Sequence, residues 1–372
     1  MRILFTGGGT GGHFFPIIAI SRELKRIAEE DRILDVELYY LGPDTSMREA
    51  LLREEIVSDV IFAGKMRRYF SFATIVDAVK IILGVLQSFW KLFVITPDVI
   101  FSKGGFASFP ILFVARIYRI PVMIHESDAV PGIVNRWSGK FARRVAVAFP
   151  DAVGYFPRER TAVVGNPIRK RLLGGIKEDS KEHLAIFSDK PVVFVVGGSQ
   201  GAAPLNQMML EGLPQFLHEF EVIHQTGEGE FPDISKQALV LLTSETKPRY
   251  HIFPFLDETR MRESYAACDI VLARAGSMIF EIAAAGRPAV LVPLPHAAQD
   301  HQRENAYAYA KAGAAVVVEE ANATPNLMLH TLLKLIGNPD IMKQMADAAE
   351  KFARVDSAEL IAREILSLAR TH

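Results

Sequence analysis

The sequence is poor in cysteine and has little net charge, and both shortages narrow the possible classes of protein. Its 372 residues include one cysteine, Cys268, which excludes an internal disulfide and favours a reducing compartment. Because Cys268 lies beside alanines and an apolar run, we interpret it as a packing residue and not as a nucleophile. The formal net charge of -1 gives no overall reason to expect a nucleic-acid partner.

The sequence also lacks an uninterrupted hydrophobic run long enough to span a bilayer. A glycine cluster follows residues 1–5 directly, which leaves no room for a signal peptide. The most hydrophobic region, residues 73–95, is interrupted by charged side chains, and its longest uncharged run is residues 81–90. That run is shorter than the roughly 20 residues that a spanning helix needs. We therefore expect no transmembrane helix and a protein that stays inside the cell.

Short apolar runs alternate with amphipathic segments along the chain, which is typical of parallel sheets covered by helices on both faces. A first series of strands is expected at residues 3–5, 37–41, 99–102, 122–125 and 144–148. A second series is expected at residues 192–196, 221–225, 250–253, 270–273, 289–293 and 315–318. The sequence therefore predicts an α/β protein with two Rossmann-like domains and a cleft between them.

Glycine and proline in the segment Gly165-Asn166-Pro167 favour a bend between these two series of strands. We place the interdomain hinge there. The predicted domains are residues 1–165 and residues 166–354. Residues 355–372 form an amphipathic pattern, and we expect a helix that packs back toward the first domain.

A glycine loop follows the first strand of each of the two series. Residues 7–12 read Gly-Gly-Gly-Thr-Gly-Gly and precede a helical run, so the backbone can approach a phosphate and the helix start can offer amides to an anion. Residues 197–202 repeat the device as Gly-Gly-Ser-Gln-Gly-Ala. Neither loop is a Walker motif, because no Gly-Lys-Ser/Thr follows. Together they predict a phosphate-binding unit in each half.

A third loop, Arg274-Ala275-Gly276-Ser277, leads into a helix that carries Glu281. The Glu281 carboxylate has two interpretations: it accepts hydrogen bonds from ribose hydroxyls, or it stabilises the helix dipole. The role of His13 is also open. A histidine beside a phosphate loop can be a general base, or it can cap the helix or orient a ligand. No metal-ligand spacing stands out, and we interpret the segment with His296, Asp300 and His301 as polar ligand contacts.

In combination these motifs resemble the MurG family, bacterial enzymes that add N-acetylglucosamine to undecaprenyl-pyrophosphoryl-N-acetylmuramyl-pentapeptide and so convert lipid I to lipid II. The matching segments occur in order from residue 3 to about residue 320: Gly8-Gly9-Thr10-Gly11-Gly12-His13 with Pro16, His125-Glu126, Gly165-Asn166-Pro167 with Arg169, residues 197–202, Arg274-Ala275-Gly276 with Glu281, and Gln302 with Asn305-Ala306. The chain departs from the family at Asp128, where asparagine is frequent, and segment 274–281 is one residue shorter.

The resemblance implies a GT-B glycosyltransferase. Its first domain, residues 1–165, would face the acceptor and the membrane, and its second domain, residues 166–354, would hold the donor, UDP-N-acetylglucosamine. It implies that Thr10, Gly11 and Gly12 lie near the donor sugar and the acceptor pyrophosphate. It also implies donor contacts, with Ser199 and Gln200 on the diphosphate, Leu256 on the uracil and Glu281 on the ribose. Gln302 would bind the sugar hydroxyls, and the remaining implied substrate contacts are Asp128, Arg169, Gly276 and Ser277.

The implied reaction inverts the anomeric carbon as the acceptor 4-hydroxyl displaces UDP. For the base that takes the hydroxyl proton we favour His13, with Asp128 and Glu126 as alternatives. Helix N-termini can stabilise the leaving diphosphate, so we expect no cofactor and no metal.

The lipid-anchored acceptor implies a peripheral enzyme at the cytoplasmic face of the bacterial membrane. Apolar residues at helical spacing between residues 75 and 93 follow a basic segment with Lys65, Arg67 and Arg68, which suits an anionic bilayer. Spacing alone also fits a helix packed inside the domain. We therefore expect core packing and membrane contact to divide this region, with residues 65–72 outermost.

Three other functions remain open at this point. A glycosyltransferase with a different lipid acceptor, such as a diacylglycerol glucosyltransferase, would differ in acceptor choice. A nicotinamide-dependent dehydrogenase would explain the first glycine loop, but it would have an acidic residue closing the second strand, which here ends Tyr40-Leu41-Gly42. A nucleotide-binding protein without catalytic activity is the third alternative.

Overall fold

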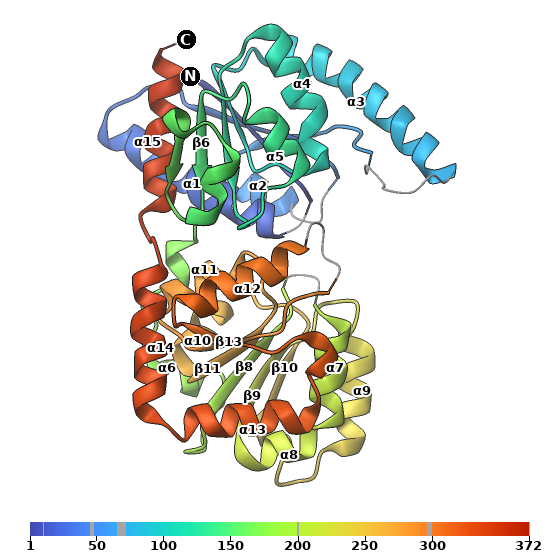
Figure 1. The fold of residues 1–372 in the computed structure, drawn as a ribbon, viewed down its shortest axis with the longest axis vertical. Helices are drawn as coiled ribbons and strands as arrows, with labels where there is room; N and C mark the ends of the chain where they lie inside the picture. The colour runs from blue at the N-terminus through green and yellow to red at the C-terminus, as the bar shows by residue number, and fades with distance from the viewer. Residues whose placement is uncertain (10, 45–47, 65–71, 199–200, 296–299, 372) are drawn as a thin grey trace. The chain divides into compact units, whose positions relative to one another are not determined.

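The computed structural model describes residues 1–371 except 10, 45–47, 65–71, 199–200 and 296–299 (Figure 1). The chain divides into two compact units. Unit 1 comprises Met1–Ile168 and Arg354–His372, and unit 2 comprises Arg169–Ala353. The first unit boundary thus lies three residues beyond the hinge position expected from Gly165, and residues 355–372 belong with unit 1.

Unit 1 is built on a parallel sheet in the order β3-β2-β1-β4-β5-β6-β7. Its strands are β1 (Arg2–Thr6), β2 (Glu37–Gly42), β3 (Val57–Val60), β4 (Val99–Ser102), β5 (Val122–Glu126), β6 (Arg144–Val147) and β7 (Thr161–Val163). The central strands β1, β4 and β5 are buried almost throughout, because helices cover both faces of the sheet.

Unit 2 repeats the architecture with the strand order β10-β9-β8-β11-β12-β13, again all parallel. The strands are β8 (Val192–Val196), β9 (Glu221–Gln225), β10 (Tyr250–Phe253), β11 (Ile270–Ala273), β12 (Ala289–Leu291) and β13 (Ala315–Val317). All six lie where the sequence predicts them. In unit 1 the sequence misses β3 and β7, the two edge strands.

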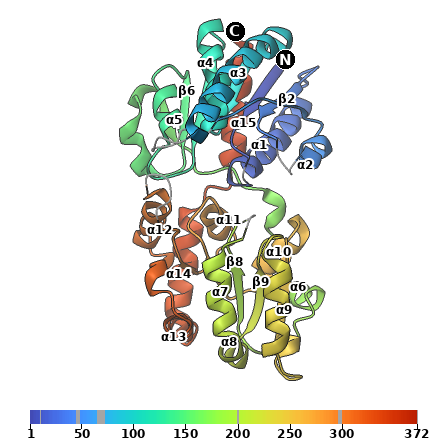
Figure 2. The ribbon, with the colours of Figure 1, turned by 90° about the vertical axis from the view of Figure 1, so that its right-hand side faces the viewer.

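Helices pack on both faces of each sheet (Figures 1 and 2). In unit 1 they are α1 (Gly11–Glu30), α2 (Arg48–Arg53), α3 (Phe72–Ile95), α4 (Phe109–Tyr118), α5 (Ile133–Ser138) and α15 (Ser357–Arg370). In unit 2 they are α6 (Lys177–His183), α7 (Ala203–Glu211), α8 (Leu213–Glu219), α9 (Phe231–Leu241), α10 (Glu258–Ala267), α11 (Met278–Ala284), α12 (His301–Lys311), α13 (Pro325–Ile336) and α14 (Pro339–Phe352).

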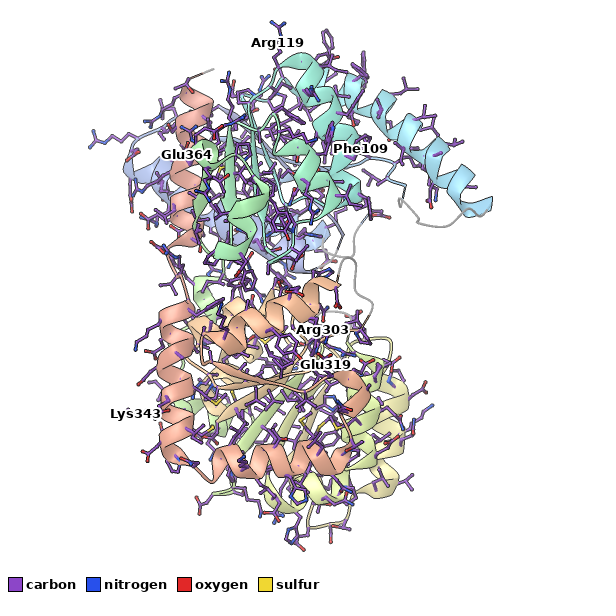
Figure 3. The ribbon with its side chains drawn as sticks, in the orientation of Figure 1. Phe109, Arg119, Arg303, Glu319, Lys343 and Glu364 are labelled. Atoms are coloured by element: carbon purple, nitrogen blue, oxygen red, sulfur yellow. The ribbon has the colours of Figure 1, made fainter. Side chains whose placement is uncertain are left out.

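The last helix, α15, completes the core of unit 1. Its apolar residues Ile361 and Ile365 are buried in one cluster with Ile17 and Leu24 of α1. Glu364, labelled in Figure 3, pairs with Arg144 of β6 at 2.6 Å. Since α1 and α15 bury one another's apolar stripes, the α1 face of the sheet is covered only when the C-terminal helix is in place.

Helix α3 lies beside α4, and only one of its faces is buried (Figures 1 and 2). Leu92 is buried, and Phe89 packs edge-on against Tyr118 of α4. By length and composition alone, its segment Val76–Ile95 could cross a membrane, and 17% of that span is buried. The expectation of no transmembrane helix considered uncharged runs only, whereas the segment as a whole is apolar enough despite Lys80 and Lys91. Since length and composition do not show that the helix spans a membrane, that expectation stays a prediction.

Candidate active site

Each sheet has one position where the strand order reverses, between β1 and β4 in unit 1 and between β8 and β11 in unit 2. In open parallel sheets, ligands bind beyond the carboxyl ends of the strands at this switch point. The glycine loop at residues 7–9 follows β1, and Lys103-Gly104-Gly105 follows β4. The loop at residues 197–201 follows β8, and Arg274-Ala275-Gly276 follows β11. The described residues of the three glycine-containing loops that the sequence singled out therefore lie at one of these two places.

His13 lies in the first turn of α1, not in the loop before it, because α1 already begins at Gly11. Its imidazole packs against two glycines. A Cβ on Gly8 would come within 2.4 Å of His13 Nδ1, and a Cβ on Gly105 within 3.5 Å of His13 Cε1. The glycines at the ends of β1 and β4 therefore make the space that the His13 ring occupies. Gly12 follows Gly11 in the same turn, and Thr10 lies outside the described residues.

Glu126, the last residue of β5, organises the loop that follows it. Its Oε1 accepts the amide proton of Asp128 at 3.0 Å, and its Oε2 accepts from the amide of Gly132 at 3.0 Å and from Asn135 Nδ2 at 2.9 Å. Burial, together with the charge of Asp128, raises the pKa of Glu126 to about 7. These bonds hold the backbone of the loop at Asp128 and Gly132 to the Glu126 side chain.

Lys103 is a buried residue of unit 1 that the sequence analysis missed, with 1% of its surface exposed. Its Nζ donates to His125 Nδ1 at 2.7 Å and to Asn166 Oδ1 at 3.1 Å. His125 Nε2 lies 2.9 Å from the carbonyl of Gly165, which can only accept, so the imidazole proton is on Nε2. A lysine immediately before a Gly-Gly pair at a strand end is the signal that could have identified it.

In unit 2 the glycine loop is shaped by the end of β9. Gly198 and Gly201 have backbone φ values of 97° and 79°, which residues with a Cβ rarely adopt. A Cβ on Gly201 would also lie 2.0 Å from the carbonyl oxygen of Thr226. Ser199 and Gln200, the implied diphosphate contacts, lie outside the described residues, so their positions stay predictions.

Gln225 connects this loop to the implied uracil site, and sequence reasoning missed it as well. Its side chain is buried at the end of β9. Its Nε2 donates to the Gly198 carbonyl at 3.0 Å, and its Oε1 accepts the amide proton of Leu256 at 3.2 Å. The side-chain amide of Gln225 thus joins the backbones of two loops. The family resemblance assigns one of them to the diphosphate and the other to the uracil.

Glu281 and Arg169 form a buried ion pair in unit 2. Arg169 Nη2 donates to Glu281 Oε1 at 3.0 Å, and Glu258 lies 4.0 Å from Arg169 Nε. The hydroxyl of Tyr265 is buried near this pair, and burial with the negative charge of Glu281 raises the pKa of Tyr265 well above its ordinary value. A guanidinium therefore holds the carboxylate of Glu281, which lies in the first turn of α11.

The other implied donor contacts that the structure describes lie beyond the carboxyl ends of the strands of the unit 2 sheet. Gly276 has open space around the position that a Cβ would take. Ser277 is the residue before α11, and its side chain makes no capping hydrogen bond there. Gln302 lies in the first turn of α12, where its Oε1 accepts the amide proton of Leu294 at 3.0 Å.

No group of three or more His, Cys, Asp or Glu side chains with metal-binding geometry occurs among the described residues. His301 is described, at the start of α12, whereas His296 is not. Cys268 is completely buried, and burial raises its thiol pKa to about 12. Such a thiol is inert as a nucleophile near neutral pH, which agrees with its interpretation as a packing residue.

Comparison with known proteins extends these observations. Residues 3–147 match the N-terminal domain of glycosyltransferase family 28, and residues 192–361 match its C-terminal domain. A relative from Thermoanaerobacter sp. (strain X514), named UDP-N-acetylglucosamine--N-acetylmuramyl-(pentapeptide) pyrophosphoryl-undecaprenol N-acetylglucosamine transferase, is 34% identical over 371 residues, covering 99% of this chain and 100% of the relative.

Solved structures with the same fold are found over nearly the full length of the chain. The crystal structure of Acinetobacter baumannii MurG is similar with a TM-score of 0.72 at 26% identity, covering 98% of this chain and 99% of that one. A putative UDP-N-acetylglucosamine 2-epimerase from Listeria monocytogenes also has a TM-score of 0.72 at 14% identity, covering 100% and 97% of the two chains. The epimerase likeness shows the fold alone.

The paired Rossmann-like sheets and the match to both halves of family 28 define a glycosyltransferase of the GT-B class. Within that class the full-length relationship is more specific. The chain belongs to the family of UDP-N-acetylglucosamine--N-acetylmuramyl-(pentapeptide) pyrophosphoryl-undecaprenol N-acetylglucosamine transferases, the MurG family.

Proposed function

We propose that this chain transfers N-acetylglucosamine from UDP-N-acetylglucosamine to the 4-hydroxyl of undecaprenyl-pyrophosphoryl-N-acetylmuramyl-pentapeptide. This step converts lipid I to lipid II in peptidoglycan synthesis. The observation that carries the proposal is the relationship over 99% of the chain to transferases named for this reaction. The two switch-point glycine loops supply the chemistry that a diphosphate donor and a pyrophosphate acceptor both require.

The donor is assigned to unit 2. The amides of the loop at residues 197–201 suit the diphosphate, the backbone of Leu256 suits the uracil, and Glu281 suits the ribose hydroxyls. Gln302, Gly276 and Ser277 are assigned to the sugar and its phosphate. One support for this assignment is that the loop at residues 197–201 follows β8 and that Gly276 and Ser277 follow β11, at the switch point of the sheet. The other is that Gln225 holds the backbones of Gly198 and Leu256, and Arg169 holds Glu281.

The proposed transfer is a direct displacement at the anomeric carbon. The acceptor oxygen forms a bond to C1 as the bond from C1 to the UDP oxygen breaks, and the configuration inverts. His13 accepts the hydroxyl proton, because its imidazole lies at the switch point of unit 1 and a ring nitrogen of an imidazole can act as a general base. Asp128 is the alternative base. Glu126 is less suited, since amide donors already occupy both of its oxygens.

The lipid acceptor places the enzyme at a membrane surface, and helix α3 offers the surface for it. One face of this helix exposes large apolar side chains, with Trp90 and Phe93 each 66% exposed. The other members of this exposed stripe are Val76, Val79, Ile82, Leu83, Leu86 and Val94. A basic side chain, that of Arg119, follows the last residue of the neighbouring helix α4 (Figure 3). We assign this face to peripheral contact with an anionic bilayer, on the cytoplasmic side where the UDP-sugar is available. The basic segment at residues 65–71 lies outside the described residues.

The test combines binding and turnover. Calorimetry should show binding of UDP-N-acetylglucosamine and neither NADH nor UDP-glucose at comparable affinity. Incubation of the loaded enzyme with a soluble lipid I analogue should then yield the β-1,4-linked disaccharide product and UDP. Binding of NADH alone would contradict the transferase assignment. Transfer to diacylglycerol in place of the lipid I analogue would leave the fold class intact and refute the acceptor.

A further inference from the structure

Three polar side chains in the interior of unit 2 form a chain of hydrogen bonds that the proposed reaction does not use. Asn206 of α7, His224 of β9 and Tyr250 of β10 come from three separate elements. His224 Nδ1 lies 2.8 Å from the Tyr250 hydroxyl, and His224 Nε2 lies 3.0 Å from Asn206 Oδ1. Asn206 Nδ2 donates to the carbonyl of Thr226 at 2.9 Å. Asn206, His224 and Thr226 are completely buried, so these bonds are made away from water.

The last acceptor determines the direction of every bond in this chain. The Thr226 carbonyl can only accept, so Asn206 presents its amide nitrogen to Thr226 and its amide oxygen to His224. That oxygen can also only accept, so the His224 proton is on Nε2, and Nδ1 accepts from the Tyr250 hydroxyl. Burial lowers the pKa of His224 to about 3, which keeps the ring neutral, as this arrangement requires. All three donors therefore point from Tyr250 toward Thr226.

The Thr226 carbonyl, where the chain ends, is in contact with the glycine loop at residues 197–201. A Cβ on Gly201 would lie 2.0 Å from the Thr226 carbonyl oxygen, so the Gly201 backbone packs against this carbonyl. The Gly201 amide in turn donates to the Gly198 carbonyl at 3.0 Å and closes the turn of the loop. A buried carbonyl that loses its donor costs about 1–3 kcal/mol, so loss of the Asn206 bond would make the Thr226 peptide rotate or admit water. Either change would move the surface on which the loop packs.

We propose that His224 is a positioning residue for the nucleotide donor: its Nε2 proton orients the Asn206 amide, which fixes the Thr226 carbonyl against the diphosphate loop. The inference rests on the proposed function, in which the loop at residues 197–201 binds the donor diphosphate. Without a donor at the position of His224 Nε2, the Asn206 amide can turn and present its oxygen to the Thr226 carbonyl. Two acceptors then face one another, and the support of the loop is lost.

Two variants that differ by one methylene group separate positioning from stability. His224→Gln has its amide nitrogen at about the place of Nε2 and keeps the bond to Asn206. His224→Asn reaches only the place of Nδ1 and keeps the bond to Tyr250. Because each variant keeps one of the two bonds, both should lower Tm by similar amounts. Calorimetry well below Tm should show the Kd for UDP at least fivefold higher in His224→Asn and within twofold of the wild type in His224→Gln.

Tyr250→Phe is the matched control at the other end of the chain. It removes the first donor and leaves the bonds from His224 to Asn206 and from Asn206 to Thr226, so Tm should fall while the Kd for UDP stays within twofold. If His224→Asn does not fold, Asn206→Ala removes the same bond to Thr226 and should raise the Kd at least fivefold.

A role in stability alone would give equal Kd values in His224→Asn and His224→Gln, and that result would overturn the proposal. Unchanged UDP binding in Asn206→Ala would overturn it as well. Failure of the proposed function would be seen in the wild type and not in the comparison of variants. A wild type that binds no UDP would refute the donor assignment, and the inference with it.

Discussion

The guanidinium of Arg169 holds the carboxylate of Glu281 at 3.0 Å in the interior of unit 2, where 6% and 10% of the two side chains are exposed. Removing one member of a buried ion pair leaves the other charge without compensation, which typically costs about 3–5 kcal/mol. The pair joins the first residue of unit 2 to helix α11. The carboxylate assigned to the ribose is therefore oriented by a residue 112 positions away in sequence.

Substitution of Arg169 by methionine should weaken both folding and donor binding. We expect a decrease of about 3 kcal/mol in the free energy of unfolding and at least a tenfold higher Kd for UDP-N-acetylglucosamine by calorimetry. Arg249→Met is the control, because Arg249 pairs with Glu245, which is 78% exposed, and such pairs contribute about 1 kcal/mol or less. Equal effects of the two substitutions would contradict a special role for Arg169.

Gln225 should contribute to donor affinity without touching the donor. Gln225→Leu removes the donor to the Gly198 carbonyl and the acceptor for the Leu256 amide, so the Kd for UDP should rise roughly tenfold. Gln225→Glu keeps the acceptor and loses the donor, and it should give an intermediate Kd. Unchanged UDP binding in both variants would show that the bridge between the two loops is not needed to position them.

His13 and Asp128 can be separated by turnover at saturating donor. His13→Ala should lower kcat by about 100-fold or more while UDP-N-acetylglucosamine binding is retained, since a general base contributes about that much. Asp128→Ala should raise KM for the acceptor more than it lowers kcat. The opposite pattern, near-normal turnover without His13 and none without Asp128, would identify Asp128 as the base.

The exposed stripe of α3 should determine membrane binding. Replacement of Trp90 and Phe93 together by serine removes two large exposed apolar side chains, and co-sedimentation with anionic phospholipid vesicles should fall at least fivefold. Leu239 and Val240 on α9 are also exposed, at 58% and 85%, and their replacement by serine provides the control. If both double variants lose binding equally, nonspecific hydrophobicity and not the α3 face is responsible.

The stability of the protein should depend on pH through Glu126. Its pKa is raised from 4.5 to about 7, so between these values the folded protein binds a proton that the unfolded chain has released. The stabilisation is complete below about pH 4.5 and is lost as the pH rises through about 7. Urea unfolding from pH 4.5 to 8 should show the wild type losing about 1–3 kcal/mol relative to Glu126→Gln. Glu364→Gln, at the surface ion pair with Arg144, should show no comparable change with pH.

The central strands could be predicted from the sequence because each is buried on both faces and reads as a continuous apolar run, as in Val192–Val196. The two edge strands of unit 1, β3 and β7, could not be predicted in this way. β3 has the sequence Val-Ser-Asp-Val with little burial, and β7 has three partly exposed residues. Edge strands are shorter and more polar because one side meets solvent, so their pattern resembles that of a loop.

The candidate site shows a similar division. Glycine loops and Glu281 were recognisable because a phosphate-binding turn needs particular residues at fixed spacing. Lys103, Gln225 and the Arg169–Glu281 pair depend on contacts between segments 22 to 112 residues apart, as the hydrogen bonds of these residues show. Local pattern could mark Lys103, which precedes Gly104-Gly105, but it does not reveal which distant segment a side chain contacts. Gly11 and Gly12 were predicted to belong to the first glycine loop, because glycine favours a loop by propensity, yet they lie within helix α1.

Unit 1 is discontinuous in sequence, since unit 2 is inserted between residues 168 and 354. During synthesis on the ribosome, the residues of unit 2 emerge and can fold before α15 exists. The apolar face of α1 meanwhile stays exposed, because Ile361 and Ile365 supply its cover only after the whole of unit 2 has been synthesised. The maturation of unit 1 thus waits for the synthesis of α15, and a nascent chain stalled in unit 2 would present that face to chaperones.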